Sequence, residues 1–280
     1  MAQVQILYLA TSRGLVHLAN PGTSDRWRPV GDALGEHDVL AVRASATDPL
    51  YAYAGTAAGI FVTPNGGSTW DLEYSGAVTA LAAAPDGAIY AGTDRGTILL
   101  GGLSPWHAVH AGAAAVLRLS SLVDGRLAAV YEGGAVEILA DGQWLPLPMA
   151  APVVSEVVGS LEAPQVLYAV GVGGLVGPSG LQPVTDTVTG ALTLLPGKPE
   201  VVLLGTQGAL HRSDDQGRTL EPVDGPTDVR VLVSPPRFQD YAYVGTGSGE
   251  LWLSSDRGRS WRRLRDGMPP VHDLSFARVR

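Results

Sequence analysis

The sequence predicts an all-β fold, a seven-bladed β-propeller of four-stranded antiparallel blades. Two observations carry this prediction: the 280 residues contain seven repeats of about forty residues, and the 36 glycines and 20 prolines make up one residue in five. Forty residues is the length of a four-stranded blade, and abundant Gly and Pro suit many short strands joined by tight turns. We therefore expect a single propeller domain over residues 1–280.

The repeats are aligned by a short segment similar to Tyr-Ala-Gly-Thr. Its copies lie at Ala10-Thr11, Gly55-Thr56, Gly92-Thr93, Val130-Tyr131, Val170-Gly171, Gly205-Thr206 and Gly245-Thr246. The steps between copies are 45, 37, 38, 40, 35 and 40 residues, and the step from the last copy round to the first is 45. The even spacing indicates that the repeats fill the chain.

The third repeat shows the predicted order of strands. We expect strands at Val78–Ala84, Ala88–Gly92, Thr97–Leu100 and Trp106–Val109, joined by the turns at 85–87 and 93–96. The first turn, Pro-Asp-Gly, combines a preset φ, an Asx-type bond and a residue that accepts positive φ. Residues 111–119 have helix propensity, but they align with the first strand of the fourth repeat, so we expect a strand there.

The two ends of the chain complement each other. The segment before Ala10 supplies only a second strand, followed by a third at Leu15–Leu18 and a fourth that opens at Trp27. The first blade therefore lacks an inner strand, and Val271–Val279 matches it. We expect the C-terminal strand to pair into the N-terminal blade, which removes open sheet edges.

A hairpin motif, Ser-x-Asp-x-Gly-x-x-Trp, occurs in three repeats. It lies at 254–261, at 213–220 with Leu in place of Trp, and at 63–70 with Thr and Asn in place of Ser and Asp; shortened forms lie at 24–27 and 141–144. The Asp accepts backbone N–H bonds, the Gly takes positive φ and the Trp anchors the outgoing strand. The residues assigned this structural role are Thr63, Asn65, Gly67, Trp70, Ser213, Asp215, Gly217, Ser254, Asp256, Gly258 and Trp261.

These hairpins resemble the Asp-box, or BNR, repeats of sialidase-like, sortilin-like and xyloglucanase-like β-propellers and of the propellers that assist photosystem II assembly. In those families the box lies on the blade periphery, away from the ligand face, so the resemblance implies the fold and leaves the activity open. An assembly or accessory role follows by analogy. Sialidase-like chemistry also needs an arginine triad and an Arg-Ile-Pro segment, and neither is found here; xyloglucanase-like enzymes use two propellers, and this chain has room for one.

The composition excludes several chemistries. The chain has no cysteine, which removes disulfides, thiolate metal sites and a Cys nucleophile. Its net charge of −8 argues against nucleic acid as a partner. The Gly-rich turns precede no helix, so we expect no nucleotide and no other cofactor. Without a leader-like segment or an apolar run of roughly 20 residues, we expect a cytoplasmic protein without membrane insertion, or a secreted one if this is a mature form.

The turns between second and third strands hold the candidate catalytic residues. Only Arg13, Asp94, Arg95 and Glu132 are ionisable there. Asp94 and Glu132 form the only candidate carboxylate pair for general acid and base or nucleophile work, although a solvated ion-pair network with Arg95 is the simpler interpretation. A glycan site would also need aromatic rings, and Tyr131 is almost the only one available.

The histidines do not suggest a metal site. His107 and His110 are three residues apart, which on a regular strand places them on opposite faces. His37 and Asp38, on a connector between blades, could reach the same face as the candidate catalytic turns, but a surface histidine is the simpler interpretation. We therefore assign no metal.

Five arginines fall within nine residues of the last repeat: Arg257, Arg259, Arg262, Arg263 and Arg265. Strand alternation predicts Arg263 and Arg265 on one face and Arg262 on the other. The charges either protect an exposed edge strand or form a docking patch for an acidic protein; Arg257, Arg259, Arg263 and Arg265, with Arg13 and Arg95, are the candidate binding residues. We predict a non-catalytic scaffold for protein–protein interaction or complex assembly, the alternative being a glycan-binding or glycosidase-like propeller.

Overall fold

The computed structural model describes residues 4–22, 26–102, 105–149, 153–184, 186–235 and 238–279. Every regular element within these ranges is a β-strand. The strands form seven four-stranded antiparallel sheets, which confirms the predicted all-β class and the blades of a seven-bladed β-propeller. No helix in the described part of the chain is long and apolar enough to cross a membrane.

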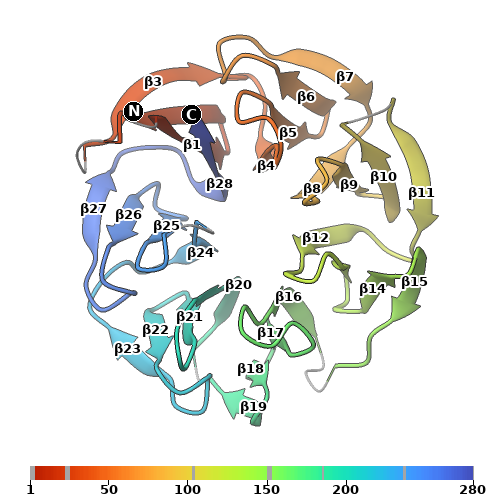
Figure 1. Cartoon of the computed structure of the whole chain (residues 1–280). Helices are drawn as coiled ribbons and strands as arrows, with labels where there is room; N and C mark the ends of the chain where they lie inside the picture. The colour runs from red at the N-terminus through yellow and green to blue at the C-terminus, as the bar shows by residue number, and fades with distance from the viewer. Residues whose placement is uncertain are drawn as a thin grey trace. The chain divides into compact units, whose positions relative to one another are not determined.

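The strands follow the chain blade by blade (Figure 1). The first blade contains β28 (Val271–Val279), β1 (Val4–Thr11), β2 (Gly14–Asn20) and β3 (Arg28–Ala33); the second, β4 (Val39–Ala44), β5 (Ala52–Thr56), β6 (Gly59–Thr63) and β7 (Asp71–Ser75); the third, β8 (Val78–Ala83), β9 (Ile89–Thr93), β10 (Thr97–Gly101) and β11 (His107–Ala111). The third blade has the four strands that the sequence predicted.

The remaining four blades have the same order. They contain β12 (Val116–Ser121), β13 (Leu127–Tyr131), β14 (Val136–Ala140) and β15 (Gln143–Pro146); β16 (Val154–Gly159), β17 (Leu167–Gly171), β18 (Gly174–Gly177) and β19 (Gly180–Pro183); β20 (Val188–Leu195), β21 (Val201–Thr206), β22 (Leu210–Ser213) and β23 (Glu221–Val223); and β24 (Val229–Val233), β25 (Ala242–Thr246), β26 (Leu251–Ser254) and β27 (Arg262–Arg265). The alanine-rich segment 111–119 forms no helix; β12 begins at Val116 after a turn.

The chain divides into two compact units. The first comprises Met1–Leu119 together with Pro269–Arg280, and the second comprises Ser120–Met268. The C-terminal strand belongs to the first unit because β28 pairs with β1 over its whole length, from Val4 opposite Val279 to Thr11 opposite Val271. The predicted completion of the N-terminal blade by the C-terminal strand is confirmed.

Side chains of β28 also bind the neighbouring inner strand. The buried carboxylate of Asp273 accepts the backbone N–H of Val42 at 3.0 Å and pairs with the guanidinium of Arg43. Ser275 Oγ accepts the N–H of Ala44 at 2.8 Å. These backbone donors of β4 are therefore satisfied by side chains of the strand that completes the first blade.

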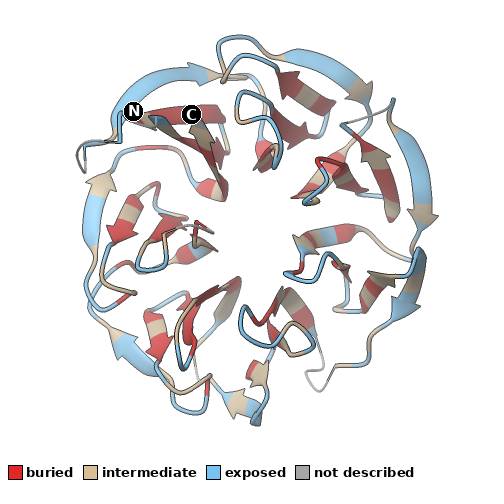
Figure 2. Ribbon diagram, viewed as in Figure 1, coloured by how far each residue is buried: buried red, intermediate tan, exposed pale blue. Residues whose placement is uncertain are grey.

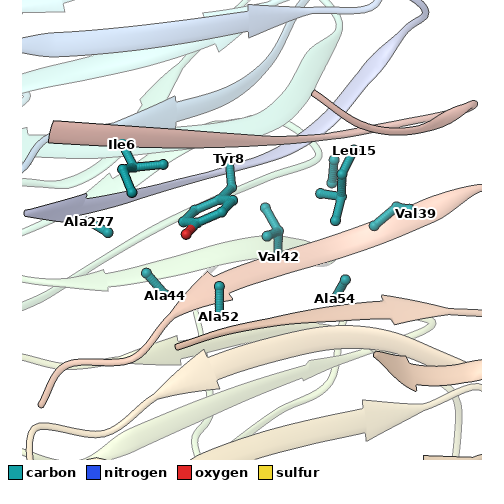
Figure 3. Close-up of a cluster of buried hydrophobic side chains, with 10 residues drawn as sticks. Ile6, Tyr8, Leu15, Val39, Val42, Ala44, Ala52, Ala54 and Ala277 are labelled. Carbon is teal, nitrogen blue, oxygen red and sulfur yellow. The ribbon is translucent and has the colours of Figure 1, made fainter. Parts of the chain in front are cut away.

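The core of the first unit lies between blades. Ile6, Tyr8 and Leu15 of the first blade face Val42 and Ala52 of the second, and the other buried members of the cluster are Ala10, Val39, Ala44, Ala54 and Ala277 (Figure 3). Small alanine side chains on the facing strands allow the two sheets to approach closely. Burial of Tyr8 raises the pKa of its hydroxyl to about 12. By contrast, β3, β7 and β11 are mostly exposed outer strands (Figure 2).

The two hairpins that contain aspartate share one set of hydrogen bonds, and the asparagine hairpin at 63–70 shares it except at the second side-chain atom. In the last hairpin, Ser254 Oγ donates to Asp256 Oδ1 at 2.8 Å and accepts the N–H of Gly258 at 2.8 Å. Asp256 also accepts the backbone N–H and the hydroxyl of Ser260, at 2.9 and 2.5 Å. The hairpin at 213–220 repeats these bonds at 2.7 to 2.9 Å, so the polar residues of the motif close the turn as predicted.

Each hairpin contains two consecutive residues of positive φ, where the sequence analysis expected one. The pairs are Gly66 and Gly67 (71° and 95°), Gln216 and Gly217 (62° and 82°), and Arg257 and Gly258 (63° and 78°). The second position is glycine for an additional reason. An added Cβ would lie 2.9 Å from His17 at Gly67, 2.7 Å from Leu175 at Gly217 and 2.6 Å from Leu203 at Gly258. Each hairpin therefore packs against the preceding blade.

The shortened motifs differ from the full ones. Asp141 and Gly142 both have positive φ, 52° and 77°, and form a two-residue turn that leads directly into β15. Ser24 and Asp25 of the other shortened motif lie outside the described residues. Trp261 closes the last hairpin, where its indole N–H donates to the carbonyl of Gly258 at 3.2 Å.

Candidate functional site

Three arginines of the second unit surround one carboxylate, and we name this group the arginine cluster: Arg212, Arg257 and Arg259 around Asp214. Arg212 lies on β22, and its side chain is only 8% exposed. Its two terminal nitrogens bind both oxygens of Asp214, while its Nε donates to the carbonyl of Arg257 at 2.8 Å. A buried guanidinium held at both ends has a fixed orientation. It therefore presents the carboxylate of Asp214 at the surface.

Asp214 is an exposed carboxylate with three arginines near it. Its side chain is 59% exposed. The hydrogen bonds from Arg212 hold the pKa of Asp214 below its ordinary value against the effect of its partial burial, and the charges of Arg212, Arg259 and Arg257 add to the lowering. These interactions favour the ionised form of Asp214.

Arg259 is the outermost member of the cluster. Its Nη2 lies 3.9 Å from Asp214 Oδ1, and its side chain is 59% exposed. Its Nη1 donates to the carbonyl of Asp256 at 3.3 Å, which folds the side chain back over its own hairpin. Both contacts are long, so most of the hydrogen-bonding capacity of this guanidinium remains directed to solvent.

Arg257 contacts the preceding blade. Its φ of 63° places it in the left-handed region, its N–H donates to Asp240, and its guanidinium lies against Gly197 on the β20–β21 loop of the preceding blade. Its Nε is buried without a hydrogen-bond partner among the described residues. Arg257 therefore links adjacent blades, whatever its role toward a ligand.

The arginines of β27 are arranged differently from the alternation that the sequence analysis predicted. Arg262, Arg263 and Arg265 pair with Leu253, Trp252 and Leu251, with a bulge between the last two pairs. Because directly opposed residues share a face, Arg265 lies on the same face as Arg262 and opposite to Arg263. The prediction was wrong because a bulge adds one residue and reverses the alternation beyond it.

Arg263 belongs to a local network of charges. Its Nη1 lies 2.8 Å from Glu250 Oε1, its Nη2 lies 3.3 Å from Asp266, and its guanidinium lies 6.0 Å from the ring centre of Trp252. The indole N–H of Trp252 donates to the other oxygen of Glu250 at 3.0 Å. The hydrogen bond from Arg263 lowers the pKa of Glu250 despite its partial burial. Arg263 is therefore largely neutralised.

Charge is unevenly distributed along the chain. From the start of β21 to the end of β27, residues 201–265, there are nine basic and eight acidic residues, a net charge of +1. The rest of the chain has ten basic and nineteen acidic residues, a net charge of −9. Residues 201–265 are thus close to neutral in a chain that is acidic overall.

The other predicted site residues are exposed and make no described contact with the arginine cluster. Arg13 lies in the β1–β2 turn, Asp94 and Arg95 lie in the β9–β10 turn, and all three belong to the first unit; Glu132 lies in the β13–β14 turn of the second unit. The structure assigns these side chains no catalytic geometry, and the acid pair stays a prediction.

Tyr131 is not a surface aromatic. Its side chain is 3% exposed, and its hydroxyl donates to Glu137 Oε2 at 2.6 Å. Burial, together with this hydrogen bond and the charge of Glu137, raises the pKa of Tyr131. The ring of Tyr131, the aromatic candidate for a glycan site, is therefore packed inside its blade.

The two histidines of β11 share a face, contrary to the prediction from their spacing. His107 pairs with Leu100 and His110 pairs with Ile98, two positions apart on β10, because a bulge at Val109 shifts the register. Elsewhere His272 Nε2 lies 3.0 Å from Asp38 Oδ1, and the ring of His37 packs on Phe61. Within the described ranges no group of three or more His, Cys, Asp or Glu side chains could hold a metal ion.

Sequence reasoning missed Arg212 and Asp214, which complete the arginine cluster. Arg212 lies two residues before Asp214, so both point to the same side of the strand end. That spacing was a usable signal, but the contact with Arg257 and Arg259 joins hairpins 45 residues apart. Only the packing of neighbouring blades reveals it.

Comparison with known proteins gives few sequence matches and many structural ones. No protein-family model matches the chain. Vacuolar protein sorting/targeting protein 10 of Mycosarcoma maydis is 33% identical over 68 residues, which are 24% of this chain and 4% of that protein. The chain thus matches only a small part of that relative's length, and no family membership follows.

Solved structures show the same fold at low sequence identity. YCF48 from Cyanidioschyzon merolae is 14% identical, with a TM-score of 0.61 over 83% of this chain and 87% of that one. A structure of YCF48 bound to a D1 peptide is 14% identical, with a TM-score of 0.50 over 91% and 77%. Dihydro-heme d1 dehydrogenase NirN, in complex with DHE, is 16% identical, with a TM-score of 0.64 over 95% and 64%. These neighbours include a peptide-binding protein and an enzyme, so they support the β-propeller fold and no single activity.

Proposed function

We propose that this chain is a non-catalytic β-propeller that binds a protein partner through the arginine cluster, and that the partner presents acidic side chains there. One observation carries the proposal. Arg259 is 59% exposed and only 3.9 Å from Asp214, whose carboxylate is already held on both oxygens by Arg212. A guanidinium with unused donors in a fixed setting suits the two-bond recognition of a carboxylate.

The charge distribution supports the same surface. Residues 201–265 are close to neutral in a chain that is otherwise strongly acidic. Long-range repulsion of an acidic segment is therefore weaker here than the net charge of the whole chain implies. Arg263 lies on the adjoining strand, and its ion pair with Asp266 is exposed, whereas its pair with Glu250 is partly buried.

The structural neighbours make peptide binding a reasonable activity for this fold. YCF48 has been solved with a D1 peptide, and an assembly or accessory role for this chain follows from that neighbour by analogy alone. We also propose that the three repeated hairpins are Asp-boxes, because their Ser or Thr, Asp or Asn and Gly residues form one shared bond set. The burial of Tyr131 leaves the glycan-binding alternative without the ring it relied on.

The test is a binding assay with matched arginine variants. The chain serves as bait in the lysate of its own host, and the captured protein is then titrated in purified form against Arg259→Glu and Arg95→Glu. Both arginines are exposed, but Arg95 lies in a β9–β10 turn of the other unit. We expect Arg259→Glu to weaken binding at least tenfold and Arg95→Glu to leave it unchanged, with equal melting temperatures.

Salt dependence and a glycan array separate the remaining possibilities. Binding through exposed guanidinium groups weakens as salt screens the charges. A partner whose affinity ignores both Arg259→Glu and salt would refute the arginine cluster as the binding surface. Specific retention of one glycan class, lost in an Asp94→Asn or Glu132→Gln variant, would support the alternative function instead.

A further inference from the structure

The chain has two asparagines, and only one has a neighbour that permits spontaneous deamidation. Asn20 precedes Pro21, and Asn65 precedes Gly66. Deamidation begins when the backbone nitrogen of the next residue attacks the side-chain amide carbon. Proline has no N–H to lose, whereas glycine has no Cβ to obstruct the attack. Asn65 is therefore the one asparagine of this chain at which the reaction is chemically favoured.

Asn65 occupies the position that the two sister hairpins fill with aspartate. Its Oδ1 accepts the hydroxyl of Thr63 at 2.9 Å and the N–H of Thr69 at 3.0 Å. Asp215 and Asp256 accept the corresponding hydroxyl and N–H at 2.7 to 2.9 Å. The hairpin thus offers the same two donors to the side-chain oxygen of an asparagine or an aspartate.

The two side chains differ at their second polar atom. Asn65 Nδ2 donates to Thr69 Oγ1 at 3.0 Å. In the sister hairpins the hydroxyl donates instead, from Thr219 to Asp215 at 2.8 Å and from Ser260 to Asp256. Rotation of the Thr69 hydroxyl is therefore the only rearrangement that an aspartate at position 65 requires.

The sister hairpins also favour the ionised acid. Burial acts to raise the pKa of Asp215, but the hydrogen bonds from Thr219 and Ser213 outweigh it and lower that pKa. The same balance lowers the pKa of Asp256. A carboxylate at position 65 would receive the equivalent donors from Thr63 and Thr69, and hydrogen bonds to a charged acceptor are the stronger kind.

The folded hairpin obstructs the first step of the reaction. The N–H of Gly66 donates to the carbonyl of Leu50 at 2.8 Å. The amide of Asn65 is held by Thr63 and Thr69, so its carbon cannot turn toward the Gly66 nitrogen without losing these bonds. Attack therefore requires local opening of the hairpin.

We propose that Asn65 is a deamidation site, that the folded hairpin slows the reaction, and that the hairpin accepts the aspartate product. The Gly66 nitrogen bonds to Cγ, and Nδ2 leaves as ammonia with the Gly66 proton. Water then opens the cyclic imide. Cleavage at Cγ gives aspartate, and cleavage at the backbone carbonyl gives isoaspartate, whose additional main-chain carbon displaces Gly67. The backbone at Gly67 has no room for such a displacement, because even an added Cβ would lie 2.9 Å from His17.

Timed incubation with peptide mapping tests the rate. The full chain is held at neutral pH, folded in buffer and unfolded in urea, and digests are resolved into Asn65, aspartate and isoaspartate forms by mass and retention. We expect conversion of Asn65 at least tenfold faster in urea, while Asn20 stays intact in the same samples. Equal rates in the two conditions, or no conversion in urea, would overturn the proposal.

Variants test the acceptance of the product. Asn65→Asp should melt no lower than the parent chain, whereas Asn65→Ala, which leaves the N–H of Thr69 without its acceptor, should melt lower. An Asn65→Asp variant that melts as low as Asn65→Ala would contradict the proposed fit. The rate measurement needs no variant, so it stands even if both substitutions impair folding.

Discussion

The packing of a hairpin against the preceding blade predicts a large cost for Gly258→Ala. Gly258 has φ +78°, and an added Cβ would lie 2.6 Å from Leu203 Cδ2 and 3.2 Å from Cδ1. The left-handed backbone costs a non-glycine residue about 1–2 kcal/mol. Overpacking against Leu203 adds about 1–3 kcal/mol. The substitution should therefore lower the free energy of unfolding by about 2–5 kcal/mol, a large share of the stability of a typical domain.

Gly133→Ala is the matched control. Gly133 has φ +88° in the β13–β14 turn, in the same compact unit, and no atom lies within 4 Å of an added Cβ. It should lose only the backbone contribution of about 1–2 kcal/mol. The difference between the two variants measures the contact between the hairpin and Leu203. Adding Leu203→Ala to each variant should reduce that difference, since the smaller side chain leaves room for the new methyl group.

Urea unfolding followed by circular dichroism gives the four free energies. The slope of free energy against urea should stay constant, so that the midpoints report stability alone. If Gly258→Ala cost no more than Gly133→Ala, the hairpin would not press on Leu203. The proposed reason for glycine at this position would then be wrong.

Three further predictions concern the first unit. Burial lowers the pKa of His17, although the charge of Asp32 acts to raise it. As pH falls, His17 is therefore protonated in the unfolded chain before it is protonated in the folded chain. The contribution of neutral, buried His17 to the free energy of unfolding is complete above the unfolded pKa of about 6.5 and is lost as pH falls below it. His17→Phe should flatten the acid side of a profile of melting temperature against pH, and an unchanged profile would refute this. Asp273→Ala leaves the buried N–H of Val42 without its acceptor, and urea unfolding should show a loss of about 1–3 kcal/mol; an unshifted midpoint would contradict it. Deletion of residues 271–280 removes β28 and should broaden and lower the thermal transition, whereas a melt as sharp and high as that of the full chain would count against the role of this strand.

Much of the architecture could be predicted because blades are built from local patterns. The spacing of the repeats predicted the four strands of the third blade. The first blade lacked an inner strand in the sequence, which identified Val271–Val279 as the strand that completes it. The hairpin residues predicted a closed turn because Ser254, Asp256 and Gly258 bond within five residues of one another. Interactions of such short range depend little on the rest of the fold.

The faces of the outer strands could not be predicted in the same way. Alternation placed Arg263 with Arg265 and separated His107 from His110, and bulges in β27 and β11 reversed both assignments. A bulge inserts one unpaired residue without a strong mark in the sequence. The first residue of positive φ in each hairpin was missed for a related reason, since Gln216 and Arg257 are not residues that ordinarily signal that conformation.

The sequence by itself determined the class of fold, the number of blades and the strand that completes the first blade, because repeat length and hairpin chemistry are properties of neighbouring residues. Only the tertiary structure decided which charges meet. Arg212 and Asp214 join Arg257 and Arg259 through the packing of one hairpin on the next, and Tyr131 turns inward to Glu137. Contacts between blades depend on how sheets pack, and packing distances are not encoded by any short stretch of the chain.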